Sequence, residues 1–165
     1  MFLKRLWTKL SPWLPAGLWY FVIFCFSAQT GSESTELSDP LAHGLLEWRF
    51  PLLSEEGRAA MMGLLSFCVR KAAHMFIYFV LTGLLVLALR KYIRTPARRA
   101  AAAAALCGVL AGLDEFHQTF VPGRSGLPRD VLIDLAGGCC FLLLWGIVLR
   151  IRNRKNKSEP REPLI

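Results

Sequence analysis

Two short runs of ionisable and polar side chains interrupt an otherwise apolar sequence, at residues 71–78 and 114–124. The first run holds Lys71, His74 and Tyr78, which are spaced to share one face of a helix. A lysine can hold an anionic head group, and a histidine can serve as a general acid or base. Because ionisable groups are costly next to hydrocarbon, several of them together indicate a functional site.

The second run is rich in hydrogen-bond acceptors and ends in turn-forming residues. Asp114 and Gln118 share a helical face, and Glu115 lies next to them. The Pro- and Gly-rich stretch that follows is expected to fold Arg124 back over the helix ends. Its guanidinium could bind a phosphate with a planar fork of donors, and the carboxylates could bind Mg²⁺ or Ca²⁺ through oxygen.

A third pair of polar side chains, Asp130 and Asp134, lies at the start of the last apolar segment, with the two carboxylates one helical turn apart. Asp130 directly precedes Val131 and fits the N-cap of a helix. Asp134 lies a full turn inside the apolar segment, where a carboxylate has no simple packing role.

Four apolar blocks must position these side chains, and each is close to the ~17–25 residues that cross a bilayer as a helix. The blocks cover residues 13–28, 72–89, 97–113 and 131–151. Hydrophobic residues make up 54% of the 165 residues. The sequence therefore predicts an all-α fold, a small four-helix transmembrane bundle that forms one domain over residues 1–151. The charged tail at residues 152–165 is expected to be cytoplasmic and disordered.

The basic residues predict how the blocks are oriented. Most of the 20 lysines and arginines precede the first block, join the second to the third, or follow the fourth. The positive-inside rule therefore places both termini in the cytoplasm and the polar clusters at the outer face of the membrane. The net charge of +8 is thus a topology signal, and the expected partners are membrane lipids, not nucleic acid. The first block could instead be a signal peptide, although Phe26 occupies a position that cleavage requires to be small.

The long outer connection between the first two blocks, residues 29–70, is expected to hold an interfacial amphipathic segment. Its apolar side chains are Leu45, Leu46, Trp48, Phe50, Leu52 and Leu53. The stretch at residues 61–67 is a second amphipathic piece that could extend the second helix. The alternative is a loop that covers the bundle instead of contacting lipid.

The five cysteines lie in or beside apolar blocks, where cysteine behaves as a small hydrophobic residue. Their number is odd, they form no Cys-x-x-Cys pair, and Cys139 and Cys140 are adjacent. We therefore expect no structural disulfide and no zinc site. No metal or other cofactor is predicted, with Mg²⁺ or Ca²⁺ at the carboxylate cluster as the alternative.

The polar clusters together resemble the motifs of the VanZ-like membrane protein family. The matching residues are Lys71, His74, Tyr78, Leu81 and Gly83 in the second block, Asp114, Glu115, Gln118, Phe120, Pro122, Gly123 and Arg124 after the third, and Asp130, Asp134 and Gly137 in the fourth. Ser27 and Gln29 at the end of the first block are similar to the family's Ser-x-Gln. The family often has Asn where this chain has Asp134, so we expect Asp134→Asn to be tolerated.

The resemblance implies a multi-pass protein of the bacterial cell membrane, in a family whose founding member is linked to resistance to the glycopeptide teicoplanin. It implies no defined reaction. We expect the outer-face cluster to bind an anionic cell-envelope lipid or a lipid-linked wall precursor. The expected ligand-binding residues are Lys71, His74, Tyr78, Asp114, Glu115, Gln118, Arg124, Asp130 and Asp134. The oligomeric state stays open.

Three other interpretations remain. A membrane enzyme acting on a lipid-linked phosphate would use His74 as general acid or base, with Asp114 or Glu115 as its partner. A proton-coupled transporter would need polar groups through the whole membrane, and these stop near one interface. A purely structural alternative is a salt-bridged plug made of Lys71, Arg124, Asp114 and Asp134.

Overall fold

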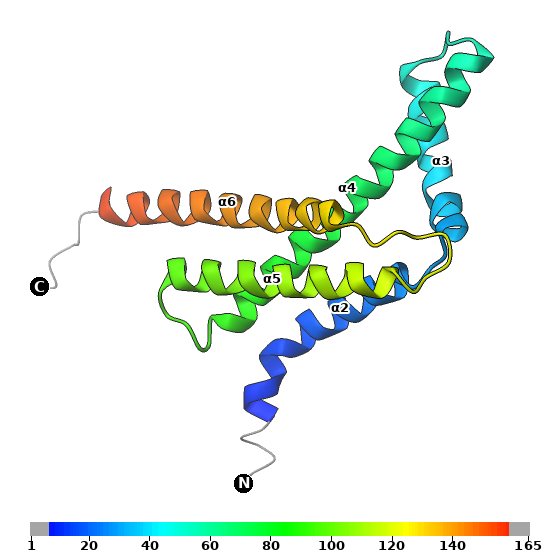
Figure 1. Ribbon diagram of the computed structural model, residues 1–165. Helices are drawn as coiled ribbons and strands as arrows, with labels where there is room; N and C mark the ends of the chain where they lie inside the picture. Colours follow the sequence, from blue (N-terminus) through cyan, green and yellow to red (C-terminus); the bar gives the residue numbers. More distant parts are fainter. Residues whose placement is uncertain (1–6, 159–165) are drawn as a thin grey trace, which may run out of the picture.

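The computed structural model describes residues 7–158, which form helices joined by short connections (Figure 1). The elements are η1 (Ser11–Trp13), α2 (Leu14–Ser27), α3 (Gly31–Arg49), α4 (Glu55–Leu89), α5 (Pro96–Gln118) and α6 (Pro128–Ser158). Prolines begin both α5 and α6, where a helix needs no backbone donor. No strand occurs within residues 7–158, and the all-α prediction is confirmed.

Four helical stretches are long and apolar enough to cross a membrane. They are Trp7–Ser27, Glu55–Leu89, Pro96–Gln118 and Pro128–Asn156. Large apolar side chains such as Leu18, Leu87 and Leu143 lie exposed on their outer surfaces, where a soluble bundle would present polar residues. The predicted four-span bundle is confirmed, with a first span that already begins at Trp7.

Helix α4 is the centre of the arrangement and contacts every other helix. Its 35 residues form one continuous helix, which at ~1.5 Å per residue is about 52 Å long. The amphipathic stretch at residues 61–67 is therefore an extension of the second span. Helix α3 packs against the N-terminal part of α4, and this pair projects away from the other helices (Figure 1).

Helix α3 has one face toward α4 and one face exposed. Its start is fixed by a capping box, in which Thr30 Oγ1 accepts from the Glu33 amide and the Glu33 carboxylate accepts from the Thr30 amide. The buried residues are Ser38, Ala42 and Leu46. The exposed apolar residues are Leu37, Leu41, Leu45 and Trp48. The first part of the predicted amphipathic segment is thus helical, with Leu46 packed inward, whereas Phe50, Leu52 and Leu53 follow the end of α3. Its contact with lipid stays a prediction.

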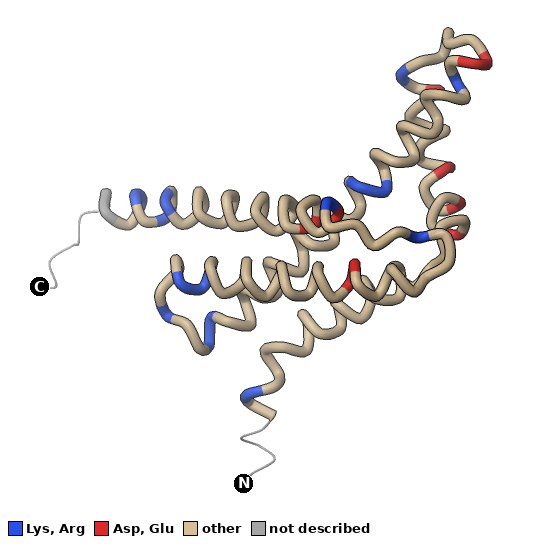
Figure 2. Tube along the Cα trace, viewed as in Figure 1, with Lys and Arg blue, Asp and Glu red and all other residues tan. Residues whose placement is uncertain are grey.

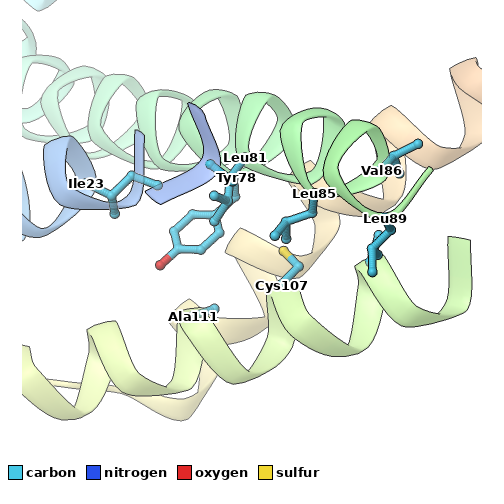
Figure 3. Packing of buried hydrophobic residues seen from close by; sticks show 10 residues of the cluster. Ile23, Tyr78, Leu81, Leu85, Val86, Leu89, Cys107 and Ala111 are labelled. Atoms are coloured by element: carbon cyan, nitrogen blue, oxygen red, sulfur yellow. The ribbon is translucent and has the colours of Figure 1, made fainter. Parts of the chain in front are cut away.

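The apolar core lies between α2, α4, α5 and α6 (Figure 3). Its buried residues include Ile23, Tyr78, Leu81, Leu85, Val86, Leu89, Cys107 and Ala111. Two aromatic side chains fasten α2 to its neighbours through backbone carbonyls: Trp19 Nε1 donates to Ile77 at 2.9 Å, and Tyr20 Oη donates to Leu110 at 3.2 Å. The five cysteines are free thiols, as expected.

The close approach of α4 and α6 depends on one glycine. A Cβ atom added at Gly137 would overlap the carbonyl oxygen of Met75, so no other residue fits without moving the helices apart. Met75 directly follows His74, and Gly137 lies nearly one turn after Asp134. This contact therefore sets the separation between the His74 and Asp134 side chains.

Lysines and arginines gather at the end of the bundle that holds the α4–α5 connection (Figure 2). There the α4–α5 connection lies beside the start of the described chain, because Lys91 Nζ donates to the carbonyl of Thr8 and Tyr92 Oη donates to that of Lys9. The polar clusters lie at the other end. The alternation of spans is thus as predicted, and the side that faces the cytoplasm stays a prediction.

The C-terminal tail differs from the prediction. Helix α6 continues through Ser158, so residues 152–158 are helical instead of disordered. Arginine and lysine have high helix propensity, and the next proline in the sequence is Pro160. The remainder of the predicted disordered tail, residues 159–165, lies outside the described residues.

Candidate functional site

Segments far apart in the sequence meet at one end of the bundle and enclose a polar cavity of about 170 Å³, here called the cleft. They are the start of α3, the middle of α4, the end of α5, the start of α6 and the α5–α6 connection. The predicted residues that line the cleft are Lys71, His74, Glu115, Gln118, Arg124, Asp130 and Asp134. Tyr78 and Asp114 do not line it and are buried next to it. The clusters therefore converge as the alternation of spans predicted.

Four cationic side chains line the cleft. These rim cations are Arg70, Lys71, Arg124 and Arg129. Lys71 Nζ lies 2.6 Å from Asp130 Oδ2, and Arg129 Nε lies 3.8 Å from Asp130 Oδ1. Asp130 is not the N-cap that its position before Val131 indicated, because α6 already begins at Pro128. It lies in the first turn of α6 and reaches across to α4.

Arg124 folds back over the ends of α2 and α5, as predicted. Its Nε donates to the carbonyl of Gln29 at 2.9 Å, and its Nη2 donates to that of Phe26 at 3.3 Å. Its Nη1 donates to Gln118 Oε1 at 3.3 Å. Burial lowers the pKa of the Arg124 guanidinium, which still stays charged at neutral pH because arginine is so strongly basic. A guanidinium has more N–H donors than these bonds use, so donors remain for a ligand.

The α5–α6 connection is held against α3 and α5 at two points. Gly123 has a φ of +73°, which glycine adopts without strain, and a Cβ atom on Gly31 would overlap the Gly123 carbonyl. The Gly31 amide donates to the carbonyl of Pro122 at 3.2 Å. Further along, Glu115 Oε2 accepts from the Leu127 amide at 3.0 Å. Glu115 therefore has a structural partner, although it lines the cleft.

Three side chains cluster at the bottom of the cleft and are here called the floor: His74 from α4 and Asp134 from α6 line the cleft, and Asp114 from α5 is buried next to them. Their ligand atoms, one ring nitrogen and two carboxylate oxygens, all lie within 4.8 Å of one another. Both carboxylates are only 1% exposed. His74 Nδ1 lies 3.7 Å from Asp134 Oδ1, too far for a hydrogen bond. His74 Nδ1, Asp114 Oδ1 and Asp134 Oδ2 have no hydrogen-bond partner among the residues that the structure describes.

Gln118 links the rim to the floor. Its Nε2 donates to Asp114 Oδ2 at 3.2 Å and to Ser27 Oγ at 2.8 Å, while its Oε1 accepts from Arg124. The predicted site residues do not include Ser27. Its sequence signal was the Ser-x-Gln at the end of the first block.

Tyr78 lies one turn further along α4 than the floor. It is completely buried, and its hydroxyl has no hydrogen-bond partner within residues 7–158. Figure 3 shows the ring pointing from α4 into the core, toward Ala111 on α5. Tyr78 is therefore a neighbour of the cleft and is not part of its wall.

The salt-bridged plug is wrong in its pairing. Lys71 pairs with Asp130, and Arg124 donates to backbone carbonyls and Gln118. Across the described part of the chain, no lysine or arginine lies at ion-pair distance from Asp114 or Asp134. The reason is depth, since Asp130 lies one turn nearer the start of α6 than Asp134 and meets Lys71 first.

A second cavity of about 220 Å³, here called the groove, adjoins the cleft and is mainly apolar. Its apolar lining residues are Phe26, Leu37, Leu41, Val69, Ala73 and Ile77. The groove and the cleft share Ser34, Arg70, His74 and Arg124. Arg70 is absent from the predicted site, although it directly precedes Lys71 in the sequence; its Nη1 donates to Thr35 Oγ1 at 3.1 Å.

A family model described as VanZ/LLP1 matches residues 13–149, which include all of the residues that line the cleft and the groove. No curated protein and no solved structure matches the chain. Four apolar helices of membrane-spanning length and this match lead to one conclusion: the chain is a multi-pass membrane protein that belongs to the VanZ/LLP1 family.

Proposed function

We propose that the chain binds an anionic amphiphile through a phosphate in its head group, either a membrane phospholipid or a lipid-linked wall precursor. The observation that carries the proposal is that the polar cleft and the apolar groove adjoin and share Arg70, His74 and Arg124. A ligand that fills both cavities needs a polar head and a hydrocarbon tail. Lipids with a charged head group have this form.

The charges of the cleft favour an anionic head group. Its lining holds four cationic side chains against three carboxylates, those of Glu115, Asp130 and Asp134. Lys71 and Arg124 are both held in place by the chain, so they lose little freedom when they bind. Phosphate oxygens can accept from a guanidinium fork and an ammonium at once.

The groove favours a lipid over a free phosphate. Leu37 and Leu41 belong both to its lining and to the exposed apolar face of α3. If that face lies in the membrane interface, the groove opens toward the bilayer. A tail could then enter sideways without leaving hydrocarbon.

The proposal places the site in the outer leaflet, where lipid-linked wall precursors are displayed, and extends to a role in glycopeptide resistance. It rests on the positive-inside rule. Reporter fusions after Leu53 and Gly126 should be external, and fusions after Lys91 and Lys155 should be cytoplasmic. The reverse pattern would put the cleft in the inner leaflet and remove the ground for any link to glycopeptides.

A membrane enzyme acting on a lipid-linked phosphate is a second candidate, favoured by the position of His74. Of its two predicted partners, Asp114 lies in the same cluster, whereas Glu115 is bonded to the Leu127 amide. A histidine near a buried carboxylate can act as a general acid or base. Formation of a product from the bound lipid phosphate would show that the chain is an enzyme and not only a binding protein.

Lipid binding by the full chain in nanodiscs tests the proposal. Native mass spectrometry should show retention of polyprenyl phosphate or phosphatidylglycerol, which separates the two lipid sources, and no retention of uncharged diacylglycerol. Arg124→Gln should weaken retention about tenfold or more, because hydrogen bonds to charged groups contribute about 1.5–3 kcal/mol. The matched control is Arg98→Gln, an exposed arginine at the opposite end, which should change nothing. Equal retention of all three lipids would sink the proposal.

A further inference from the structure

We infer that the floor residues His74, Asp114 and Asp134 form a binding site for one divalent transition cation, of the class of Mn²⁺ or Zn²⁺. The site differs from the expectation of no metal, and from Mg²⁺ or Ca²⁺ at carboxylates alone, because a histidine nitrogen completes the ligand set. It stands whether or not a lipid occupies the cleft.

The geometry of the floor is close to that of a metal site. The three ligand atoms lie within 4.8 Å of one another. Ligands about 2.1 Å from a metal lie at most about 4.2 Å apart, when they face each other across the ion. Small side-chain rotations therefore bring all three atoms onto one cation.

Each of the three floor residues also has a buried polar atom that makes no hydrogen bond within the described residues. His74 Nδ1, Asp114 Oδ1 and Asp134 Oδ2 have no hydrogen-bond partner in the described chain. Asp114 and Asp134 are each 1% exposed, so bulk water does not solvate their carboxylates. A buried charge without a partner costs several kcal/mol. A divalent cation would supply the missing contacts and balance both negative charges.

No side chain of the described part supplies that positive charge. Lys71, three residues before His74 in the sequence, lies 2.6 Å from Asp130. Arg124 donates to two backbone carbonyls and to Gln118. Gln118 also donates to Asp114 Oδ2, while Asp114 Oδ1 has no hydrogen-bond partner among the described residues. Such a bond orients a metal-binding carboxylate and strengthens its site.

The donor set decides the class of cation. Imidazole nitrogen suits Zn²⁺ and other transition metals, whereas carboxylate oxygen also suits Mn²⁺, Mg²⁺ and Ca²⁺. One nitrogen with two oxygens therefore favours Mn²⁺ or Zn²⁺ over Mg²⁺ and Ca²⁺. His74 and Asp134 line the cleft, which gives the cation a route in and leaves coordination positions open on that side.

The test is a cation titration of the full chain, stripped with chelator and held in uncharged-lipid nanodiscs so that no anionic lipid contributes. Loss of the free Mn²⁺ signal in electron paramagnetic resonance should show saturable binding of one Mn²⁺ per chain, with Zn²⁺ in competition and Mg²⁺ far weaker. His74→Ala and Asp114→Asn should each weaken Mn²⁺ binding about tenfold or more. The matched control is His43→Ala, an exposed histidine on α3, which should bind as the parent chain does.

A second readout covers variants that fold poorly. Mn²⁺ should raise the thermal unfolding midpoint of the parent chain and of His43→Ala, and should raise it less in His74→Gln, which keeps a polar side chain of similar length. Absence of saturable binding, or equal binding by the floor variants and His43→Ala, would overturn the inference. In that case the floor carboxylates hold protons and no metal.

Discussion

At the rim of the cleft the cationic side chains have partners in the chain, whereas the carboxylates of the floor, one helical turn deeper, have no cationic partner within the described residues. Lys71 has Asp130 at 2.6 Å, and Arg124 donates to Gln29, Phe26 and Gln118. Asp114 and Asp134 are more deeply buried than any rim cation.

The difference separates two kinds of polar site. A charge with partners in the chain keeps its place without a ligand, so the rim has its shape before anything binds. A buried charge without partners is costly, and it persists where a ligand supplies the contact. The rim is therefore prepared for an anion, and the floor for a cation.

The largest expected effect comes from separating α4 and α6, the two helices that carry residues of both the rim and the floor. Gly137→Leu would force α6 away from Met75, and overpacking of this kind costs about 3 kcal/mol of unfolding free energy. Cation and lipid binding should fall together. Gly146→Leu on the same helix is the control, because a Cβ atom there meets nothing within 4 Å. Thermal unfolding in detergent measures both, and similar midpoints for the two variants would contradict the role of Gly137.

Lys71→Met tests the rim alone. It keeps the apolar stem, removes the ammonium and leaves Asp130 with Arg129 only. Because the pair is 22% and 15% exposed, stability should fall by about 1 kcal/mol, less than for a fully buried pair.

Retention of a phosphate lipid by Lys71→Met should fall about tenfold. Mn²⁺ affinity should not fall. Lipid retention is measured by native mass spectrometry and Mn²⁺ by resonance titration. A loss of stability as large as 3–5 kcal/mol with unchanged lipid retention would show that Lys71 is structural only.

Asp134→Asn tests the floor alone. The amide keeps an oxygen of similar shape but removes one negative charge, so the fold should tolerate it with a change of less than about 1 kcal/mol. Mn²⁺ affinity should fall about tenfold, while phosphate-lipid retention should not fall, because the cleft loses a negative charge. Lys71→Met and Asp134→Asn should therefore each weaken the binding of a different ligand. Parallel losses of both ligands in both variants would mean that rim and floor are one site.

The smallest expected effect concerns Gln118, which links the rim of the cleft to its floor. Gln118→Met removes the side chain that contacts Asp114, Ser27 and Arg124 at once. Stability should fall by about 1 kcal/mol, and each ligand should bind about threefold more weakly. Affinities measured for the single variants and for Gln118→Met combined with Asp134→Asn should be non-additive for Mn²⁺ only.

The spans and the convergence of the clusters could be predicted because charges inside apolar segments stand out and consecutive spans must alternate sides. The pairing could not be predicted. Asp114, Asp130 and Asp134 all lie at the same end of the bundle, and which of them meets Lys71 depends on their depth and on how α5 and α6 are rotated. The contact of Gly137 with Met75 fixes that rotation for α6, and no local pattern encodes it.

The start of helix α3 has a sequence signal that a search for apolar blocks does not detect. Its start carries Thr30-x-x-Glu33, a capping-box pattern. Its composition is polar and Pro40 lies inside it, so it does not stand out as an apolar block. The four-residue spacing of Ser38, Ala42 and Leu46 on its buried face is visible only once the helix is assumed.

The continuity of α4 makes the projecting α3–α4 pair a lever. No proline interrupts α4, and the contact of Met75 with Gly137 is a natural fulcrum. From that fulcrum the helix extends about 30 Å to Glu55 but only about 6 Å to Lys71, at ~1.5 Å per residue. A sideways displacement of the tip therefore reaches Lys71 reduced about fivefold.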